Sequence, residues 1–206
     1  LPHKESIIPL LDEVDEKALA IGSVNTVINT GGKLKGYNTD VVGIAVALKD
    51  ASLKGKSVLI FGAGGAARAV AFHVRECGAN IFSFDRTFQK AQALCDKFGG
   101  TALEASALNE RQFDVVVNAS PVGLHPNTDA TPVSKEIIRK GRIVFDLVYN
   151  PLETRLMREA KEKGAQAISG LTMLIGQALE QERLWLGRDI PDSGYTELLE
   201  NELSSR

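Results

Sequence analysis

The sequence predicts an α/β protein built on a parallel β-sheet, and the order of its apolar segments is the main reason. Four short, almost continuously apolar runs alternate with segments of helical spacing. The runs cover 57–61, 80–84, 114–118 and 143–148, and the helical segments cover 65–77, 88–98 and 133–139. Strands that are apolar on both faces and separated by helices are typical of a parallel sheet with helices on both sides.

Residues 1–40 follow a different pattern, which predicts a smaller α/β unit. The expected elements are a helix over 5–22 that Pro9 limits or starts, a strand over 24–28, a glycine turn at 31–32 and a returning strand over 34–37. Thr39 or Asp40 is a natural N-cap for the apolar helix expected over 41–48.

The end of the chain returns to helices. We expect an amphipathic helix over 153–163, a strand over 166–169, a helix over 171–186 with Trp185 on its apolar face, and a last helix over 195–203. The chain therefore divides into 1–40, 41–169 and 170–206. We expect the last segment to pack against the first, so that these two form one discontinuous, truncated α/β domain beside the parallel sheet.

Composition excludes several classes of function. The 206 residues are 44% hydrophobic and 24% charged, which is ordinary for a soluble, folded protein. A net charge of −2 gives no electrostatic reason to expect a nucleic acid or an anionic membrane as partner. The two cysteines have no C-x-x-C spacing, so neither a disulfide framework nor a metal site is predicted. We expect a cytoplasmic protein with a small-molecule partner, and the oligomeric state stays open.

A glycine-rich turn follows the first apolar run without a break. Gly62-Ala63-Gly64-Gly65-Ala66-Ala67 fits G-x-G-x-x-G/A, with Gly62, Gly64 and Ala67 at the three defining positions. Gly62 allows a tight turn, Gly64 lets the backbone approach a pyrophosphate, and Ala67 keeps the helix close to the strand. The N–H groups at the start of that helix then attract phosphate. The sequence therefore predicts a Rossmann-like, dinucleotide-binding domain.

The end of the second apolar run bears on the choice of dinucleotide. Asp85, Arg86 and Thr87 stand there in succession. An acid at this point accepts the ribose hydroxyls of NAD, whereas an arginine receives the 2′-phosphate of NADP. Arg86 offers a planar fork suited to phosphate, and the Thr87 hydroxyl adds a donor. These residues favour NADP and leave NAD open as the alternative.

Several motifs in this order resemble the shikimate dehydrogenase family. They are Pro2-His3-Lys4-Glu5, Ser23-Val24-Asn25-Thr26-Val27, Gly36-Tyr37-Asn38-Thr39-Asp40, Gly62 to Arg68, Asp85-Arg86-Thr87, Asn118-Ala119-Ser120-Pro121-Val122-Gly123, Asp146-Leu147-Val148-Tyr149-Asn150-Pro151 and Gly170 to Gln177. The resemblance spans residues 1 to 187 and implies NADPH-linked reduction of 3-dehydroshikimate to shikimate, in aromatic biosynthesis.

The resemblance also implies roles for single residues. Lys4 is similar to the family's catalytic lysine and Asp40 to its partner carboxylate, while Asn25 and Gln177 resemble substrate-hydroxyl binders and Tyr149 lines the same cleft. An ammonium at Lys4 can give a proton to the developing alkoxide, and a carboxylate at Asp40 fixes its orientation. The implied cofactor-binding residues are Gly62, Ala63, Gly64, Gly65 and Ala66 at the pyrophosphate, Asp85, Arg86 and Thr87 at the adenosine ribose, and Asn118, Ala119, Ser120, Leu147 and Gly170 towards the nicotinamide.

Two departures from the family pattern leave alternatives open. The family's opening strand with its Ser-x-Ser pair has no counterpart here, so we expect an upstream polypeptide, for example a fused dehydroquinase, to supply it. Without that segment the alternative is a non-catalytic nucleotide-binding fragment. Asp85 stands where NADP-specific members commonly have Asn, which keeps open a quinate/shikimate dehydrogenase that uses either cofactor.

Overall fold

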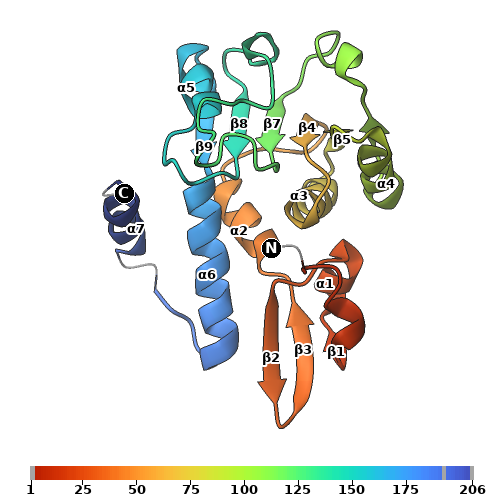
Figure 1. Ribbon diagram of the computed structural model, residues 1–206, viewed down its shortest axis with the longest axis vertical. Helices are drawn as coiled ribbons and strands as arrows, with labels where there is room; N and C mark the ends of the chain where they lie inside the picture. Colours follow the sequence, from red (N-terminus) through yellow and green to blue (C-terminus); the bar gives the residue numbers. More distant parts are fainter. Residues whose placement is uncertain (1–2, 192–193, 205–206) are drawn as a thin grey trace.

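The computed structural model describes residues 3–191 and 194–204 and contains two β-sheets, the larger in the upper half of Figure 1. The strands of the larger sheet run parallel in the order β6-β5-β4-β7-β8-β9. They are β4 Ser57–Phe61, β5 Asn80–Phe84, β6 Thr101–Ala102, β7 Val115–Asn118, β8 Ile143–Asp146 and β9 Gln166–Ser169. The predicted α/β fold with a parallel sheet is confirmed, although the two residues of β6 were too few to form a recognisable pattern.

Alternate residues of β4 enter two separate hydrophobic cores. Val58 and Ile60 pack with α3 (Gly65–Glu76) and α4 (Phe88–Phe98), whereas Leu59 and Phe61 pack with α5 (Arg155–Glu162) on the opposite face. All four side chains are buried. Because both faces of the sheet are covered, its strands need apolar residues at every position, which is the pattern in the sequence.

The helix expected over 133–139 is wrong. This stretch forms a single 3-10 turn, Lys135–Ile137, and a second such turn that the sequence analysis missed spans Ala105–Leu108. The Ser134 hydroxyl accepts a hydrogen bond from the N–H of Glu136, which starts the turn, and Ile138 is extended, which ends it. Apolar side chains of this turn reach the core from a short loop rather than from a helix.

The smaller sheet has the order β1-β3-β2, with β1 Glu13–Val14 parallel to β3 Lys33–Tyr37 and β2 Thr26–Thr30 antiparallel to it. Gly31 and Gly32 form the turn with φ of 60° and 91°. Positive φ is cheap for glycine, so this pair allows the tight connection. The predicted hairpin is therefore confirmed.

The helix expected over 5–22 is wrong for most of its length. The helix α1 spans Glu16–Ile21, and a 3-10 turn, Ile8–Leu10, and strand β1 precede it. The Asp15 carboxylate caps α1 by accepting from the N–H groups of Lys17 and Ala18. The apolar spacing was compatible with one helix, but Asp15 starts a new element and β1 pairs with β3 instead.

Helix α6, Gly170–Leu186, crosses α2, Asp40–Ala47, at a pair of glycines. A Cβ built on Gly176 would lie 3.1 Å from the Cα of Gly43, so the two backbones are in close contact. Further along α6, the Gln181 side chain donates to the Thr26 hydroxyl of β2 at 3.0 Å. This crossing brings polar side chains of α6 next to the start of α2 and to β2.

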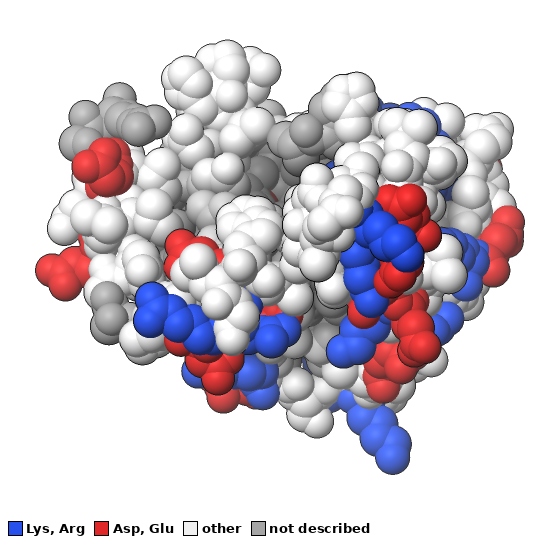
Figure 2. Space-filling model, turned by 90° about the horizontal axis from the view of Figure 1, so that it is seen from below, with Lys and Arg blue, Asp and Glu red and all other residues white. Residues whose placement is uncertain are grey.

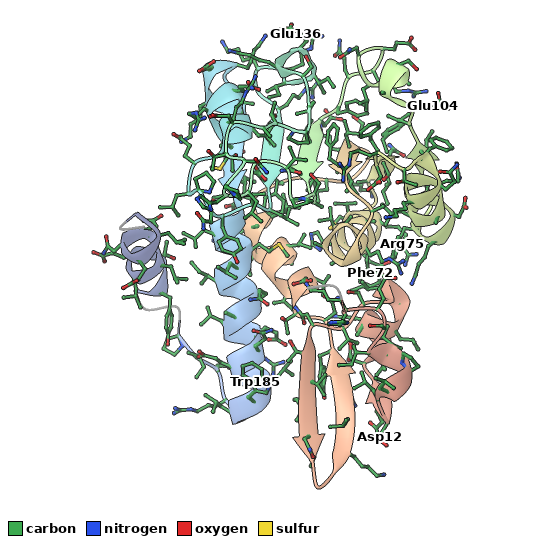
Figure 3. The ribbon with its side chains drawn as sticks, viewed as in Figure 1. Asp12, Phe72, Arg75, Glu104, Glu136 and Trp185 are labelled. Carbon is green, nitrogen blue, oxygen red and sulfur yellow. The ribbon has the colours of Figure 1, made fainter. Side chains whose placement is uncertain are left out.

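Trp185 does not lie in the core, contrary to expectation. Its side chain sits at the lower end of α6 and is 56% exposed (Figure 3).

The last helix, α7 Tyr195–Ser204, contacts α6. Acidic and basic side chains lie next to each other on the face that Figure 2 shows. Within the part of the chain that the structure describes, no helix is long and apolar enough to span a membrane.

Candidate functional site

Lys4 and Asp40 meet in a half-enclosed position between the two sheets. The Lys4 Nζ lies 2.5 Å from Asp40 Oδ2, and the two side chains are 21% and 6% exposed. The main chain holds Lys4 in place, because its carbonyl oxygen accepts from the N–H of Val24 at 2.7 Å. The structure therefore brings together the amine and the carboxylate that the sequence analysis paired.

Asn25 is the centre of the polar cluster around this pair. Its Nδ2 donates to Asp40 Oδ1 at 2.9 Å and to Thr39 Oγ1 at 3.0 Å, and it lies 3.5 Å from Gln177 Oε1. Its Oδ1 accepts from the Thr39 N–H at 2.9 Å and from the Thr26 hydroxyl at 2.8 Å. Three predicted residues, Asn25, Asp40 and Gln177, thus share one network with Lys4.

Thr39 belongs to the same cluster, and the sequence analysis did not assign it there. Its hydroxyl contacts both Asn25 and Gln177, the latter at 3.3 Å. Neither Thr39 nor Asp40 caps α2 through its side chain; Asn38 does so, since its Oδ1 accepts from the N–H of Val41 at 3.3 Å. Thr39 is the N-cap residue of α2, as predicted, but it makes no side-chain capping bond because its hydroxyl points into the cluster. The neighbouring Asn38-Thr39-Asp40 run was the available signal.

The phosphate loop joins β4 to α3 as predicted. Gly62 has φ of 100°, and a Cβ there would lie 3.0 Å from the carbonyl oxygen of Ala119, so a side chain would be both strained and crowded. A Cβ on Gly64 would meet nothing within 4 Å, and α3 begins at Gly65 and Ala66. The N–H groups of the first turn thus lie beside open space, which suits an anion.

Asp85, Arg86 and Thr87 lie between β5 and α4, at the edge of a cavity. The Oδ1 of Asp85 accepts from the N–H of Thr87 at 2.9 Å, so part of this carboxylate is occupied by its own loop. The cavity has a volume of about 890 Å³, and the predicted residues on its wall are Gly62, Asp85, Arg86, Thr87 and Ser120. A volume of this size is within the range of cofactor sites.

Lys90 is a further basic residue that the sequence analysis missed. It lines the large cavity and also a neighbouring one of about 320 Å³, which Ala63, Gly64, Arg68 and Lys97 line as well. Burial is the main cause that lowers the pKa of Lys97, and the nearby Arg68 adds to it. The available signal for Lys90 was its position three residues after Thr87.

Together the two cavities are lined by more cations than acids: Arg68, Arg86, Lys90 and Lys97 against Glu5 and Asp85.

Asn118 lies at the end of β7 and is fully buried. Its Nδ2 donates to Asp146 Oδ1 at 2.9 Å and to the Val122 carbonyl at 3.0 Å, while its Oδ1 accepts from the N–H and hydroxyl of Ser120. Every polar atom of this side chain is thereby engaged within the protein. Asn118 shapes the loop that carries Ala119 and Ser120, and its side chain has no free donor to offer a cofactor.

Asp146 anchors the next loop, which carries Leu147 and Tyr149. Its carboxylate accepts from Asn118, from the N–H of Val148 at 3.1 Å and from the Thr154 hydroxyl at 2.6 Å. Burial raises the pKa of Asp146 to about 6, against the effect of these three donors. The sequence analysis did not assign this residue, although it opens the Asp146–Pro151 motif.

The remaining predicted residues lie around the same sheet edge. Gly170 packs on Leu147, since a Cβ at Gly170 would lie 2.3 Å from the Leu147 carbonyl oxygen. Tyr149 is 37% exposed and makes no hydrogen bond with the Lys4 cluster among the described residues. Residues 3–191 and 194–204 hold no group of three His, Cys, Asp or Glu side chains arranged to bind a metal ion.

Comparison with known proteins identifies the family. Three family models match: shikimate / quinate 5-dehydrogenase over 45–149, shikimate dehydrogenase substrate binding domain over 1–27, and shikimate 5′-dehydrogenase C-terminal domain over 170–194. Shikimate dehydrogenase (NADP(+)) of Methanothermobacter thermautotrophicus is 42% identical over 204 residues, covering 93% of this chain and 71% of that protein. The chain belongs to the shikimate dehydrogenase family. The resemblance based on motifs is therefore confirmed.

Solved structures of this family agree with the fold. Shikimate 5-dehydrogenase from Thermus thermophilus, in complex with NADP(H) and shikimate, has a TM-score of 0.88 and 41% identity, covering 98% of this chain and 77% of that one. Quinate dehydrogenase from Corynebacterium glutamicum, in complex with NAD, has a TM-score of 0.86 and 32% identity, covering 100% and 76%.

Fusion also occurs among the relatives of this shikimate dehydrogenase family member. The bifunctional 3-dehydroquinate dehydratase/shikimate dehydrogenase of Arabidopsis thaliana is 37% identical and covers 97% of this chain but 36% of that protein. The dehydrogenase part of a longer polypeptide can therefore match nearly the whole of this chain.

The structure fits a dinucleotide. A Cβ on Gly64 would meet no atom within 4 Å apart from its chain neighbours, and α3 begins at the next residue. Arg86, Thr87 and Lys90 line the adjoining cavity and supply donors for a phosphate. The Methanothermobacter thermautotrophicus relative is NADP-dependent by name, and the Thermus thermophilus structure is a complex with NADP(H).

Proposed function

We propose that the chain catalyses the reversible, NADPH-dependent reduction of 3-dehydroshikimate to shikimate, a step of aromatic amino-acid biosynthesis. The observation that carries this proposal is the Lys4–Asp40 pair, with 2.5 Å between Nζ and Oδ2, next to the start of the phosphate-loop helix. An amine that is half-enclosed, oriented and beside a dinucleotide site is the group that a carbonyl reduction requires.

NADPH supplies a hydride to the carbonyl carbon when it is bound. The carbonyl oxygen then gains negative charge and takes a proton from the Lys4 ammonium, which gives the alcohol and leaves a neutral amine. Asp40 Oδ2 keeps the Nζ in position and stabilises its charge before the transfer. Asp40 Oδ1 stays hydrogen-bonded to Asn25, so the carboxylate is fixed from both sides.

Asn25 and Gln177 are proposed to bind hydroxyl groups of the substrate ring. Both amides lie within the Lys4 cluster, and a substrate hydroxyl would replace one of their present partners, for example at the 3.5 Å contact between Asn25 Nδ2 and Gln177 Oε1. The Thr39 hydroxyl links the two amides, since it accepts from Asn25 Nδ2 and donates to Gln177 Oε1. Tyr149, on the loop after β8, is exposed and is proposed to contact the substrate from the sheet side.

The cofactor is proposed to cross the sheet edge from Asp85 to Gly170. Gly62 to Ala66 would hold the pyrophosphate through backbone N–H groups, and Arg86, Thr87 and Lys90 would receive the 2′-phosphate of NADP. The backbone and short side chains of Ala119, Ser120 and Leu147, together with Gly170, would flank the nicotinamide end. Residues 1–40 and 170–206 form the proposed substrate domain and 41–169 the cofactor domain.

The test is the oxidation of shikimate by NADP⁺, followed through the absorbance of the reduced nicotinamide. Parallel arms replace shikimate by quinate and NADP⁺ by NAD⁺, and each is run with the 206-residue chain and with the longest natural polypeptide that contains it. We expect the highest kcat/KM for shikimate with NADP⁺, in the longer polypeptide if an upstream segment completes the substrate domain. Equal use of quinate or NAD⁺ would favour the dual-specificity alternative.

A binding measurement separates the enzyme from a simple nucleotide binder. If NADP⁺ binds but no polypeptide turns over either substrate, the chain is a non-catalytic nucleotide-binding module and the proposal is wrong. A cytoplasmic location remains a prediction from the sequence, and cell fractionation tests it.

A further inference from the structure

The two adjacent glycines of the phosphate loop face different surroundings. A Cβ on Gly64 would meet no atom within 4 Å, whereas a Cβ on Gly65 would lie 2.8 Å from the Ser23 hydroxyl and 3.3 Å from the Cδ of Lys4. The first glycine therefore faces the space where a phosphate would bind. The second faces the small-sheet side, at the stem of the proposed proton donor.

Ser23 packs against Gly65 without using its hydroxyl. The residue is 0% exposed, and its Oγ has no hydrogen-bond partner among the described residues. Its backbone is fixed, because the Asn38 side chain donates to the Ser23 carbonyl at 2.8 Å. Val24, the next residue, bonds to the Lys4 carbonyl. Ser23 and Lys4 thus form one fixed surface that rests on the start of α3.

Two further contacts tie this surface to the same side of the large sheet. Glu5, which follows Lys4, pairs with Arg68 of α3 at 2.9 Å. The Lys97 Nζ of α4 donates to the carbonyl of Ile21 at 3.0 Å. These contacts flank Gly65 and hold the small sheet close to α3, so the spacing at Gly65 is set by the packing around it.

We infer that Gly65 is a positioning residue for Lys4, in addition to any contact that its N–H makes with a phosphate. Its missing side chain lets Ser23 and the Lys4 stem approach α3, which places the amine beside both Asp40 and the cofactor site. Cofactor and proton donor are therefore positioned by the same turn of helix. This inference rests on the proposed function of Lys4 as the proton donor.

A methyl group at residue 65 has a direct consequence for the amine. An atom at 2.8 Å from an oxygen and 3.3 Å from a carbon forces one neighbour to move. Asn38 holds the Ser23 backbone and the Ser23 side chain is fully buried, so the partly exposed Lys4 stem is the neighbour that has room to move, and with it the Nζ. A displacement of about 1 Å at a reacting group costs roughly 10²-fold in rate.

The experiment compares Gly65→Ala with Gly64→Ala and adds Ser23→Ala to each. Gly65→Ala is expected to lower kcat by about 10- to 100-fold and to change the Kd of NADP⁺ by less than about 3-fold. Gly64→Ala is the matched control, and it is expected to raise the Kd of NADP⁺ because its methyl group enters the phosphate space. Ser23→Ala alone is expected to leave kcat near wild type, since its hydroxyl makes no bond.

The decisive result is rescue. Ser23→Ala removes the atom nearest to the added methyl group, so the Gly65→Ala/Ser23→Ala protein is expected to recover most of the lost kcat. The same substitution in Gly64→Ala is expected to restore nothing. Urea unfolding of the cofactor-free proteins gives a second readout. Ser23→Ala is expected to have a more favourable effect on the unfolding midpoint in the Gly65→Ala protein than in the wild type.

Additive unfolding midpoints together with an unrescued kcat would overturn the inference, because Gly65 would then act through the cofactor alone. If no wild-type polypeptide turns over either substrate, the longest natural one included, the proposed function is wrong. The midpoint comparison in the cofactor-free proteins still decides whether residue 65 packs on Ser23. The two failures are therefore distinguishable.

Discussion

The two halves of the site are built in different ways. The cofactor half consists of contiguous segments, 62–66 after β4 and 85–87 before α4, and each was recognisable as a unit in the sequence. The substrate half consists of single side chains, Lys4, Asn25, Asp40 and Gln177, that come from four different segments. Each of these residues taken alone resembles an ordinary surface or turn residue.

This difference has energetic consequences. The proposed cofactor half would act mainly through backbone N–H groups at the start of α3, so the replacement of one side chain would leave most of its contacts intact. In the substrate half the side chains bond to one another, and Asn25 alone bonds to four neighbours. Substitutions should therefore cost more on the substrate side, and the effects below are ordered accordingly.

The largest expected effect is that of Lys4→Ala. Removing the amine removes the proton donor, so kcat should fall by about 10³-fold, within the range known for general acids. The Kd of NADP⁺ should stay within about 3-fold of wild type, because the phosphate loop keeps its backbone donors. Steady-state rates and a direct titration with NADP⁺ measure the two quantities.

Lys35→Ala is the matched control for this variant. Lys35 lies on β3 of the small sheet, is 44% exposed and pairs with Glu13 at 3.4 Å, so its loss should change kcat little. Near-normal turnover in Lys4→Ala would show that another group delivers the proton.

The fold was predictable where the pattern is long and local. Strands 57–61 and 80–84 and the helix 88–98 have the bounds that the apolar runs gave, because both faces of the sheet are covered. The prediction of a helix over 5–22 was wrong. The apolar spacing was compatible with a helix, but Glu13 and Val14 form β1 and pair with β3 instead. The prediction that Trp185 lies in the core was wrong, because helical periodicity does not show whether another element covers a given face.

The site was predictable to the extent that it matched ordered motifs. Lys4 and Asp40 were paired on the resemblance, and the structure brings them together. Thr39, Lys90 and Asp146 were missed, since their importance depends on what lies across from them in space. Asn118 stays a predicted residue on the cofactor's path, and its side-chain bonds to Asp146, Ser120 and Val122 are contacts that no spacing could reveal.

The next effect concerns Asp146 and the pH dependence of stability. Burial raises its pKa to about 6 in the folded protein, above the ordinary value of 3.8. The folded state therefore binds this proton more tightly than the unfolded state, and the contribution to stability rises as the pH falls from 6 towards 4. Two pKa units correspond to roughly 3 kcal/mol as an upper bound. Urea unfolding at a series of pH values should show this rise in wild type and not in Asp146→Asn.

Asp114→Asn provides a control of opposite sign at the other end of the sheet. The N–H of Ser57 is the main cause that lowers the pKa of Asp114, and Arg142 and Lys56 contribute. Its contribution to stability is present above the ordinary pKa and is lost as the pH falls through the folded value. The free energy of unfolding of the Asp114→Asn protein should therefore fall less at low pH than that of the wild type.

For Asp146, identical pH profiles of stability in the wild type and in Asp146→Asn would contradict the role of burial.

A smaller effect is expected for Arg86→Ala on the cofactor side. An exposed arginine that binds a phosphate contributes about 1.4 kcal/mol, so the KM for NADP⁺ should rise about 10-fold with kcat unchanged. The KM for NAD⁺, which has no 2′-phosphate, should not change. Arg111→Ala is the control, because this arginine stacks on Phe82 away from the large cavity. A parallel rise for both cofactors would indicate that Arg86 holds the loop instead.

The smallest expected effect is that of Asp85→Asn, and it tests how far a local motif can be altered without loss. An asparagine keeps the Oδ1 that accepts from the N–H of Thr87, so the loop before α4 should stay in place. The variant removes one negative charge from the wall that Arg86 and Lys90 share. The ratio of kcat/KM for NADP⁺ to that for NAD⁺ should therefore increase by about 3- to 5-fold, through attraction of the 2′-phosphate. Asp96→Asn, on the exposed face of α4, is the charge-matched control. An unchanged ratio would mean that Thr87 holds the Asp85 carboxylate away from the ribose, and cofactor choice would then depend on Arg86 and Lys90.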